Sequence, residues 1–360
     1  MRARTWILIS VLAILAIAGA VRFFPSTGPA DGDVAIRYGI TPFQDSALPA
    51  VASELGWYKQ RGLNVKLVDL GWSDVPVALA SGSIDVALYN FDSYQSSWPS
   101  LQKGGKDVIF FAPLYVWNGA AIMVHPGPTK LAGDLSKLTP ARRAAAVKLV
   151  MQQLRGKRIG VTEGTTFEQT VLDALRVAGM DPKRDVQLIN ARPEDNLAAF
   201  LSGDLDAFSG GLTERVQAKR HGAVELLIGP DVSLPVIDGL VARREFAEAH
   251  PKEMQALLDA WFQTIAYMSS DIPARSATIR NYLRGKASVD YTANEYAIAW
   301  TFQYFPVSRS DAVRSFIDPS GRYFWKPIWQ KNSADLISQK KIDEAIPELE
   351  FLGGSSLPPR

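Results

Sequence analysis

Residues 156–167 read GKRIGVTEGTTF, and residues 186–211 read VQLINARPEDNLAAFLSGDLDAFSGG. Short runs at 158–161 and 186–189 have the length and composition of buried strands. The segment 166–178 between them has apolar residues at helical spacing and is followed by glycine, which is typical of a helix end. This stretch therefore predicts alternating strands and helices, the pattern of an α/β sheet.

The same pattern occurs a second time, 121 positions earlier and without a gap. Residues 37–41 (RYGIT) align with 158–162 (RIGVT), and residues 81–85 (SGSID) align with 202–206 (SGDLD). Any two βαβ units can resemble each other, because all such units share this order of elements. The constant register over about fifty positions favours a structural pair, two similar α/β lobes that face each other.

The remaining chain extends this pattern and then departs from it. Strand and helix segments alternate up to about residue 242, so we predict a mainly parallel, doubly wound sheet in each lobe. From 243 to about 341 the pattern is almost wholly helical. Thr139 and Pro140 begin an additional amphipathic helix that ends near Leu154, since proline suits a first helical turn. The predicted fold class is α/β with a helical C-terminal region.

The N-terminus has the pattern of an export signal. Two arginines precede an apolar run from Trp6 to Val21, and the small residues at 18–20 (AGA) match a cleavage pattern. A membrane-spanning helix needs about 20 residues, which is more than this run supplies. We therefore predict a signal peptide at 1–20, with an uncleaved membrane anchor as the alternative, and a flexible leader at 21–32.

The balance of charge and the absence of cysteine exclude several classes of function and anchoring. Without residues 1–20, which hold two arginines and no acid, the chain carries 37 basic and 37 acidic side chains. This balance argues against nucleic acid as a partner, because such binding needs a clustered basic surface. The chain has no cysteine, so it forms no disulfide and is no cysteine-anchored lipoprotein. A periplasmic protein of a Gram-negative type of cell fits these features best.

Open parallel α/β sheets bind ligands at the carboxyl ends of their strands. This rule selects the loops after the predicted strands. Their aromatic side chains can hold a small organic solute, and their acidic side chains favour an amine-bearing or zwitterionic solute over an inorganic anion. The candidate ligand-binding residues are Thr41, Phe43, Gln44, Asp45, Trp72, Ser73, Asn90, Asp92, Trp117, Asn118, Glu163, Thr165, Thr166, Gly211 and Thr213.

These candidates also have structural interpretations. Thr165 and Thr166 stand at a predicted helix start, where a threonine caps free backbone N–H groups with or without a ligand. Trp72 and Trp117 can pack against their own helices, as large aromatic residues commonly do. Both interpretations stay open for each residue.

No catalytic or metal-binding pattern is found. The three histidines, His125, His221 and His250, are far apart in sequence and lack metal-ligand spacing. No nucleophile elbow, phosphate-binding glycine loop or Cys–His pair occurs. We therefore predict no catalytic residue, no metal and no cofactor, although a pair of acid–base carboxylates stays open.

Three motifs resemble the substrate-binding proteins of nitrate/sulfonate/taurine-type ABC importers, a family that is also related to binders of thiamine-pyrimidine precursors. Residues 52–65 (ASELGWYKQRGLNV) are similar to the opening of these proteins. Residues 78–87 (ALASGSIDVA) and 154–161 (LRGKRIGV) are similar to two of their later segments. Together the motifs are fairly specific, and the resemblance covers roughly residues 36–251.

The resemblance implies a periplasmic binding protein type II fold, in which two doubly wound lobes are joined by a two-segment hinge and close over a solute. The crossings of the hinge are expected near Tyr115–Ala121 and Leu234–Gly239. The expected domains are lobe 1 at 33–116 plus 238–345, lobe 2 at 117–237, and a tail at 346–360.

The implied function is that of a periplasmic, monomeric solute-binding component of an ABC importer. It would deliver a sulfonate, taurine-like, amine or pyrimidine solute to a membrane permease. The helix at 139–154 and the aromatic segment at 323–329 lie outside the family motifs. An exported enzyme on the same scaffold and a membrane-anchored sensory protein are the alternatives.

Overall fold

The computed structural model describes residues 34–103, 107–127, 135 and 138–347. The described residues from Ala35 onward form one compact unit. The predicted signal peptide and leader lie outside the described residues, as does the predicted tail from 348 onward. Among the described residues, no helix is long and apolar enough to cross a membrane.

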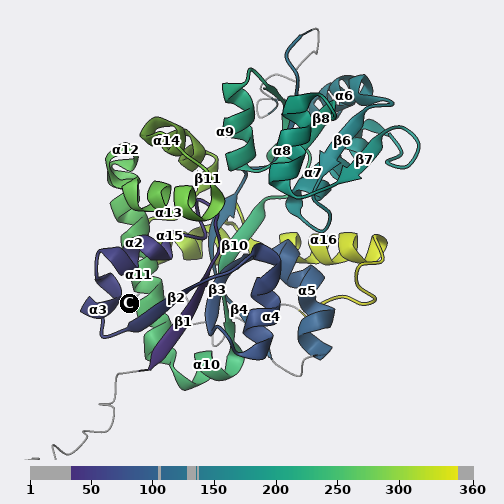
Figure 1. The fold of residues 1–360 in the computed structure, drawn as a ribbon. Coiled ribbons are helices and arrows are strands. Elements are labelled where there is room, and N and C mark those ends of the chain that lie inside the picture. Colours follow the sequence, from purple (N-terminus) through teal and green to yellow (C-terminus); the bar gives the residue numbers. More distant parts are fainter. Residues whose placement is uncertain (1–33, 104–106, 128–134, 136–137, 348–360) are drawn as a thin grey trace, which may run out of the picture. The chain divides into compact units, whose positions relative to one another are not determined.

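Six strands of the described chain form the first sheet: β1 (Ala35–Ile40), β2 (Asn64–Asp69), β3 (Val86–Asn90), β4 (Val108–Trp117), β10 (Val236–Arg243) and β11 (Gln303–Tyr304). Their order across the sheet is β11-β4-β10-β3-β1-β2 (Figure 1). β1 pairs in parallel with β2 and β3, whereas β10 runs antiparallel to both β3 and β4.

Five strands of the described chain form the second sheet: β5 (Ala121–Val124), β6 (Arg158–Val161), β7 (Gln187–Asn190), β8 (Ala207–Gly210) and β9 (Val224–Ile228). Their order is β7-β6-β8-β5-β9. β6 pairs in parallel with β7 and β8, and β5 runs antiparallel to β8 and β9. Each sheet thus contains the same parallel trio with antiparallel strands added at one side.

The two sheets and the alternation of strands with helices are confirmed, but the prediction of mainly parallel sheets is wrong. Apart from β11, the strands with antiparallel partners across from the parallel trios are those that the chain enters or leaves when it passes between the sheets. The chain leaves the first sheet after β4, enters the second at β5, and returns from β9 to β10. A strand that arrives from the other sheet is not joined by a right-handed βαβ crossover, so nothing forces it to be parallel.

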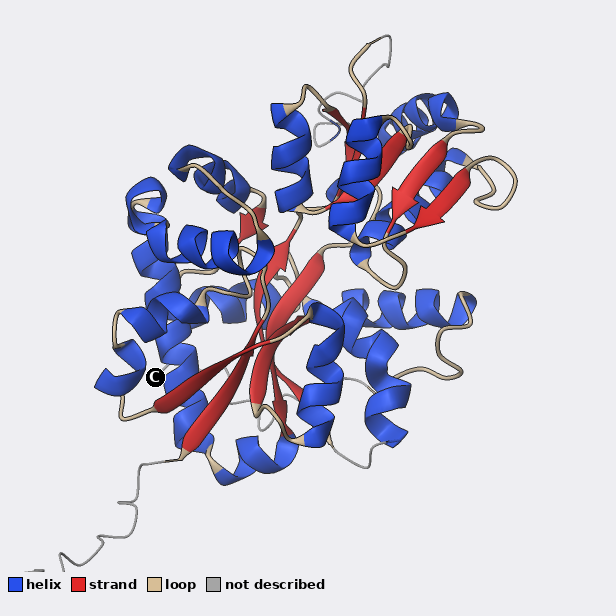
Figure 2. Cartoon of the chain, in the orientation of Figure 1, coloured by secondary structure: helices blue, strands red, loops and turns tan. Residues whose placement is uncertain are grey.

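Short helices accompany the strands of the first sheet (Figure 2). They are α2 (Pro49–Glu54), α3 (Trp57–Gln60), α4 (Val75–Ser81) and α5 (Phe91–Lys103), with a 3-10 turn at Trp72–Asp74. The helical spacing of Leu48, Val51, Ala52 and Leu55 predicts one helix over 45–59. The structure instead breaks it at Gly56, whose φ of 73° lies in the left-handed region that favours glycine.

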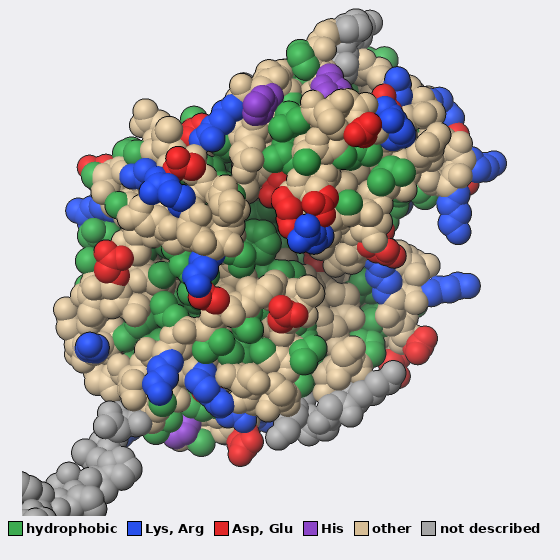
Figure 3. Space-filling view, in the orientation of Figure 1, with side chains coloured by type: hydrophobic (Ala, Val, Ile, Leu, Met, Phe, Trp, Pro, Cys, Tyr) green, Lys and Arg blue, Asp and Glu red, His purple; other side chains and the backbone are tan. Residues whose placement is uncertain are grey.

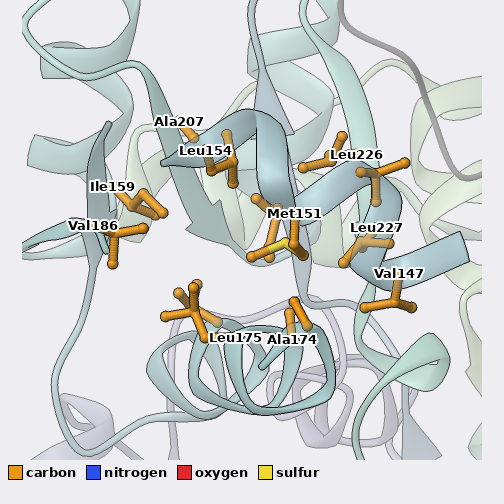
Figure 4. Close-up of a cluster of buried hydrophobic side chains, with 14 of the residues drawn as sticks. Val147, Met151, Leu154, Ile159, Ala174, Leu175, Val186, Ala207, Leu226 and Leu227 are labelled. Carbon is orange, nitrogen blue, oxygen red and sulfur yellow. The ribbon is translucent and has the colours of Figure 1, made fainter. Parts of the chain in front are cut away.

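Helices of the second sheet are α6 (Pro140–Met151), α7 (Thr166–Ala178), α8 (Pro193–Ser202) and α9 (Leu212–Arg220), with 3-10 turns at Gln152–Leu154 and Gly229–Asp231. The helix predicted at 139–154 is therefore present as α6. It packs into the core of this sheet through Val147, Val150 and Met151. Figure 4 shows Val147 and Met151 among side chains of α7 and of the strands. The additional helix is part of the core and not an appendage.

The C-terminal region is helical, as predicted. It comprises α10 (Arg244–Ala249), α11 (Pro251–Ser270), α12 (Ile272–Arg275), α13 (Ala277–Ala287), α14 (Ala293–Thr301), α15 (Arg309–Ala312), a π-helical turn (Val313–Ile317) and α16 (Trp325–Ser338). The sequence pattern predicts the first helix of this region at Arg243–Tyr267. The structure divides that helix at His250, because Pro251 lacks the N–H that a continuous helix needs.

The sequence repeat corresponds to a repeated contact. At the start of β1, the backbone N–H of Arg37 donates to the Asp85 carboxylate at 2.9 Å. At the start of β6, the backbone N–H of Arg158 donates to the Asp206 carboxylate, also at 2.9 Å. In both copies the arginine guanidinium binds the same carboxylate as well as a glycine carbonyl in the turn before the next strand. The repeated residues therefore hold β1 to β3 in the first sheet and β6 to β8 in the second.

Candidate functional site

A cavity of about 230 Å³ lies where the chain passes between the two sheets. Its wall includes both connecting segments, residues 117–120 and 229–236. The first turns of α5, one face of α7, and α16 with the residues after it complete the wall. In the orientation of Figure 1, Figure 3 shows a hollow near the middle of the displayed face, with apolar side chains at its floor and both acidic and basic side chains at its rim.

Asp92, in the first turn of α5, is the central acidic residue of this cavity. The side-chain amide of Asn332 on α16 donates a hydrogen bond to its carboxylate. Burial raises the pKa of Asp92 to about 7, with further increases from the charges of Asp173 and Asp335, while Asn332 and Lys341 act in the opposite direction. Asp92 therefore changes its charge close to neutral pH.

One wall of the cavity is the N-terminal half of α7. Thr165 caps this helix, because its Oγ1 accepts a hydrogen bond from the backbone N–H of Phe167 at 3.2 Å and donates to the Thr162 carbonyl at 2.6 Å. The Thr170 hydroxyl donates back to the Thr166 carbonyl at 2.8 Å. The capping interpretation of Thr165 is therefore correct, and its side chain also lines the cavity.

The opposite wall is α16, which spans from α5 to α7. Trp329 is 1% exposed and packs against the rings of Phe91 and Tyr94, with centroids 5.2 and 5.9 Å apart. At the other end, the Gln339 side-chain amide donates to the side-chain carbonyl of Gln169 on α7 at 3.0 Å. The aromatic segment near residue 325 thus anchors the helix that closes this side of the cavity.

The cations that line the cavity each have a carboxylate partner. Arg176 pairs with Asp173 at 2.8 Å, and Lys331 pairs with Asp335. Lys341 pairs with Glu168 at 3.2 Å. Asp92, in contrast, forms no ion pair with any Lys or Arg of the described residues. The cavity therefore contains one carboxylate whose charge the protein does not neutralise by contact.

Among the described residues, two more carboxyls have no cation as an ion-pair partner: Asp238 on β10 of the first sheet and Asp45 in the loop after β1. Asp45 and Asp238 are 5% and 3% exposed, and both act electrostatically on the hydroxyl of Tyr115, which is fully buried. Burial raises the pKa of Asp45 to about 6. It raises the pKa of Asp238 well above its usual range, and the charges of Asp45 and Asp92 add to that increase. These carboxyls and Asp92 therefore act on one another electrostatically.

Of the candidate residues from sequence, the structure brings five to the cavity. These are Asp92, Trp117, Asn118, Thr165 and Thr166. They come from α5, from the connection after β4, and from the start of α7, so the strand-end rule selected both sides of the cavity. A role of these residues in ligand binding stays a prediction.

Three candidates from the loop after β1 are buried and serve the packing of the first sheet. The Thr41 hydroxyl hydrogen-bonds with that of Ser46. The Gln44 carbonyl accepts a hydrogen bond from the Tyr296 hydroxyl at 2.8 Å, and the Asp45 carboxylate accepts one from the Gln303 amide at 2.8 Å. These contacts join the loop to α14 and β11 and leave none of the three among the lining residues.

Phe43, Trp72 and Asn90 form a second group outside the lining. The Trp72 ring lies 5.7 Å from the Phe43 ring and 4.7 Å from the Tyr89 ring. Its indole N–H donates to the Ser93 hydroxyl at 3.0 Å, and the Asn90 side chain accepts from the Ser93 backbone N–H at 2.8 Å. These side chains fasten the start of α5, which carries Asp92. Ser73, in the adjacent 3-10 turn, is exposed.

The remaining candidates of the second sheet have partners of their own. The Glu163 carboxylate accepts a hydrogen bond from the Asn190 amide at 3.1 Å. The backbone N–H of Gly211 donates to the Glu214 carboxylate at 2.9 Å, closing the start of α9. The Thr213 hydroxyl hydrogen-bonds with the Tyr291 hydroxyl at 3.0 Å, which links α9 to the C-terminal helices.

Sequence reasoning missed the α16 side of the cavity and the buried carboxyl of the first sheet. Asn332 and Asp335 are ordinary polar residues of a helix, and only folding brings them to Asp92. Asp238 carried a usable signal, because it is a single acid in the apolar run VIDGLVA of β10. Such a residue in a buried strand is commonly functional or strongly partnered.

Among the described residues, no group of three or more His, Cys, Asp or Glu side chains is arranged to hold a metal ion. The carboxyls around the cavity are distributed over α5, α7 and α16. The arrangement suits binding of a small molecule in which hydrogen bonds and charge fix the orientation and Trp117 supplies apolar surface.

Comparison with known proteins gives a consistent family assignment. The sequence profile described as the NMT1-like family matches residues 30–281. A protein of Brucella abortus named as a binding protein is 26% identical over 254 residues, which cover 68% of this chain and 70% of the relative. The taurine-binding periplasmic protein of Escherichia coli is 30% identical over 118 residues, or 29% of this chain and 33% of that protein.

Solved structures share the fold. The periplasmic aliphatic sulphonate binding protein SsuA of Escherichia coli has a TM-score of 0.63 at 19% identity, with 88% of this chain and 95% of that chain covered. The periplasmic nitrate-binding protein NrtA of Synechocystis has a TM-score of 0.59 at 17% identity, with 88% and 92% covered. At these identities the likeness establishes the two-lobe binding-protein fold, while the ligand has to be argued from the site itself.

Proposed function

Because this chain belongs to the NMT1-like family, we propose that it is the solute-binding component of an ABC importer. The family match, which spans 30–281 and so includes the second sheet and five of the six strands of the first, carries the proposal. The cavity supports it, because its lining comes from both connections between the sheets and from helices of each. A small solute held there touches both halves of the protein at once.

The proposed lobes follow the sheets: 33–116 plus 238–345 for the first and 117–237 for the second. A solute that contacts α5 and α16 on one side and α7 on the other stabilises the arrangement in which these walls are close. The free energy of this closure comes from contacts that exist only when both walls touch the solute. The closed arrangement is then the form that a membrane permease receives.

The proposed site of action is the periplasm, with residues 1–20 removed on export, and the proposed form is a monomer. Relatives named as periplasmic proteins support the location. Relatives named as binding proteins support solute capture over catalysis. The predicted ligand contacts are those candidates that line the cavity, Asp92, Trp117, Asn118, Thr165 and Thr166.

A binding screen tests the proposed function. The purified exported protein is heated with sulfonates, taurine, nitrate, amines and pyrimidines, one at a time. Ligands that bind only the folded state raise the melting temperature in proportion to the logarithm of their concentration. We expect one chemical class to do so and to bind reversibly in calorimetry. Turnover of a solute without reversible binding would instead favour an enzyme.

A further inference from the structure

The proposed function does not specify the chemical class of the solute. The distribution of charged side chains around the cavity favours one class. We propose that the solute carries a positively charged nitrogen group and that the Asp92 carboxylate receives that group. This inference rests on the proposed function, since it concerns the same cavity. It assigns a specificity-determining role to Asp92, with the amide of Asn332 as the group that orients it.

The first argument is the balance of charge in the cavity. Each of its three lining cations is already paired with a carboxylate, as described for Arg176, Lys331 and Lys341. Within the part of the chain that the structure describes, Asp92 has only the neutral amide of Asn332 as a side-chain hydrogen-bond partner. An anionic solute would therefore find no unpaired cation among the lining residues and would be repelled by Asp92. A cationic solute would supply the missing partner.

The second argument comes from the sheet behind the cavity. Val236 lines the cavity, and Asp238 is two residues further along β10, so both side chains lie on the same face of the strand. On the neighbouring strand β4, Trp117 pairs with Val236 and also lines the cavity, and Tyr115 pairs with Asp238. Asp238 is 3% exposed, and its Oδ2 has no hydrogen-bond partner among the described residues.

The Asp45 carboxyl, whose pKa is about 6, is mainly ionised at neutral pH and makes the electrostatic potential on this side of the cavity more negative. Asp238, whose pKa burial raises well above its usual range, adds negative charge only in its ionised form. Ionised carboxyls repel an anion and attract a cation. The indole of Trp117 lies in the cavity wall, and an aromatic face adds a favourable contact with a cation. The three groups Asp92, Asp45 and Trp117 thus favour the same kind of solute.

Because Asp92 titrates near neutral pH, the inference has a pH signature. The charged groups around it are Asp173 and Arg176 on α7, Asp335 and Lys331 on α16, Lys341 after α16, and Asp238 on β10. A cation binds the ionised form, so its affinity should rise by about tenfold from pH 6 to pH 8 for a pKa of about 7. An anion should show the reverse dependence.

The experiment uses the exported protein and two matched series of probes. Benzylamine, benzyl alcohol and benzenesulfonate share one skeleton, and butylamine, butanol and butanesulfonate share another. Calorimetry at pH 6, 7 and 8 measures their affinities. We expect at least one amine to bind more tightly than its neutral and anionic counterparts and to gain affinity with pH.

Three variants complete the test. Asp92→Asn keeps the shape and should reduce amine affinity at pH 8 at least tenfold and abolish the pH dependence. Asp92→Glu keeps the charge and should retain the pH dependence. Asp204→Asn, an exposed carboxylate in the turn before β8, should change neither. Circular dichroism verifies that each variant is folded.

Several results would overturn the inference. These are tighter binding of a sulfonate than of its amine, no amine binding at all, or amine binding that is indifferent to Asp92→Asn. Sulfonate binding in the cavity would leave the proposed transport function intact while rejecting the cation. Failure of these probes together with every solute of the wider screen would reject both.

Discussion

Arg37 and Asp85 are joined by hydrogen bonds from both the backbone and the side chain of the arginine, with N–O distances of 2.9, 2.9 and 2.5 Å. Asp85 also accepts a hydrogen bond from Arg243 at 2.8 Å, so a single carboxylate joins β1, β3 and β10. Its side chain is 2% exposed. Although burial opposes ionisation, the hydrogen bonds from the two arginines lower the pKa of Asp85 below its usual value.

This contact predicts unequal stability losses in the two copies of the repeat. Asp85→Asn removes a buried carboxylate that two guanidinium groups share, and these groups are 39% exposed in Arg37 and 18% exposed in Arg243. Because both can partly recover solvent, the variant should reduce the free energy of unfolding by about 2 kcal/mol. The equivalent Asp206 side chain is 29% exposed, so Asp206→Asn should cost about 1 kcal/mol. Urea unfolding of both variants in one buffer measures the difference, and equal losses would contradict this account.

The repeat can be recognised in the sequence because its residues make contacts with one another inside each βαβ unit. Each copy places an arginine at a strand start, a glycine two residues later, and an aspartate before the third strand, and all of these make contacts that depend on few other residues. Gly39 and Gly160 are also equivalent positions of the repeat. At each of them a side chain of the same unit, Ile84 or Leu205, lies too close to leave room for a Cβ. A pattern whose contacts stay within one βαβ unit can be recognised from one sequence.

Only part of the cavity lining could be predicted from the sequence, because the rest is formed by residues that are far apart in the chain. The strand-end rule located Asp92 and Thr165, because it follows from the order of strands and helices. The contact between Asp92 and Asn332 joins residues 240 positions apart, and no local pattern encodes it. The same holds for the contact between Gln169 and Gln339. Such pairs form through packing of the whole C-terminal region against both sheets.

A second prediction concerns close packing at Gly160. An added Cβ there would lie 2.5 Å from Asn196 Oδ1 and 2.6 Å from Leu205 Cδ1, so Gly160→Ala should lower the free energy of unfolding by about 1–3 kcal/mol. Gly285 in α13 is the matched control, because nothing lies within 4 Å of its Cβ position. Gly285→Ala should stabilise by about 0.5–1 kcal/mol. Thermal unfolding checks both signs, and a neutral Gly160→Ala would refute the packing argument.

A third prediction concerns pH. Burial is the largest cause of the raised pKa of Asp45, about 6, and the hydrogen bonds from its backbone neighbourhood and Tyr115 reduce the increase. Below about pH 4 the carboxyl is protonated in both folded and unfolded states and contributes nothing to the pH dependence. Between about pH 4 and pH 6 the unfolded state ionises first, so stability falls as pH rises; above pH 6 the loss is constant.

Asp45→Asn should remove that decrease, because an amide does not titrate yet still offers an oxygen to Gln303. At pH 7.5 the variant should be more stable than the parent by up to about 3 kcal/mol. Unfolding free energies measured every half unit from pH 4 to 8 test this, with Asp204→Asn as the control for a surface carboxylate. An unchanged slope between pH 4 and 6 would assign the effect to another group.

The last prediction concerns a contact far from the cavity lining. The Arg220 guanidinium on α9 donates to both carboxylate oxygens of Glu295 on α14, at 2.7 and 2.5 Å. The pKa of Glu295 is lowered to about 2, and the hydrogen bond from Arg220 is the largest cause. Burial acts to raise this pKa, whereas the hydrogen bonds from Thr292 lower it further. The pair is therefore ionised above about pH 4.5 and loses its strength as the pH falls towards 2.

If α9 and α14 belong to different lobes, as proposed, this pair favours the arrangement in which the lobes are close. Both side chains are partly exposed, so the pair is worth about 1 kcal/mol, and Glu295→Gln should weaken solute binding about fivefold without touching the cavity. Calorimetry at pH 7.5 measures the loss, and solution scattering should show a larger radius of gyration. Arg284→Gln breaks an exposed pair with Asp290 beside the same helices and should leave affinity unchanged. Equal affinities in Glu295→Gln and the parent would show that the pair does not contribute to closure.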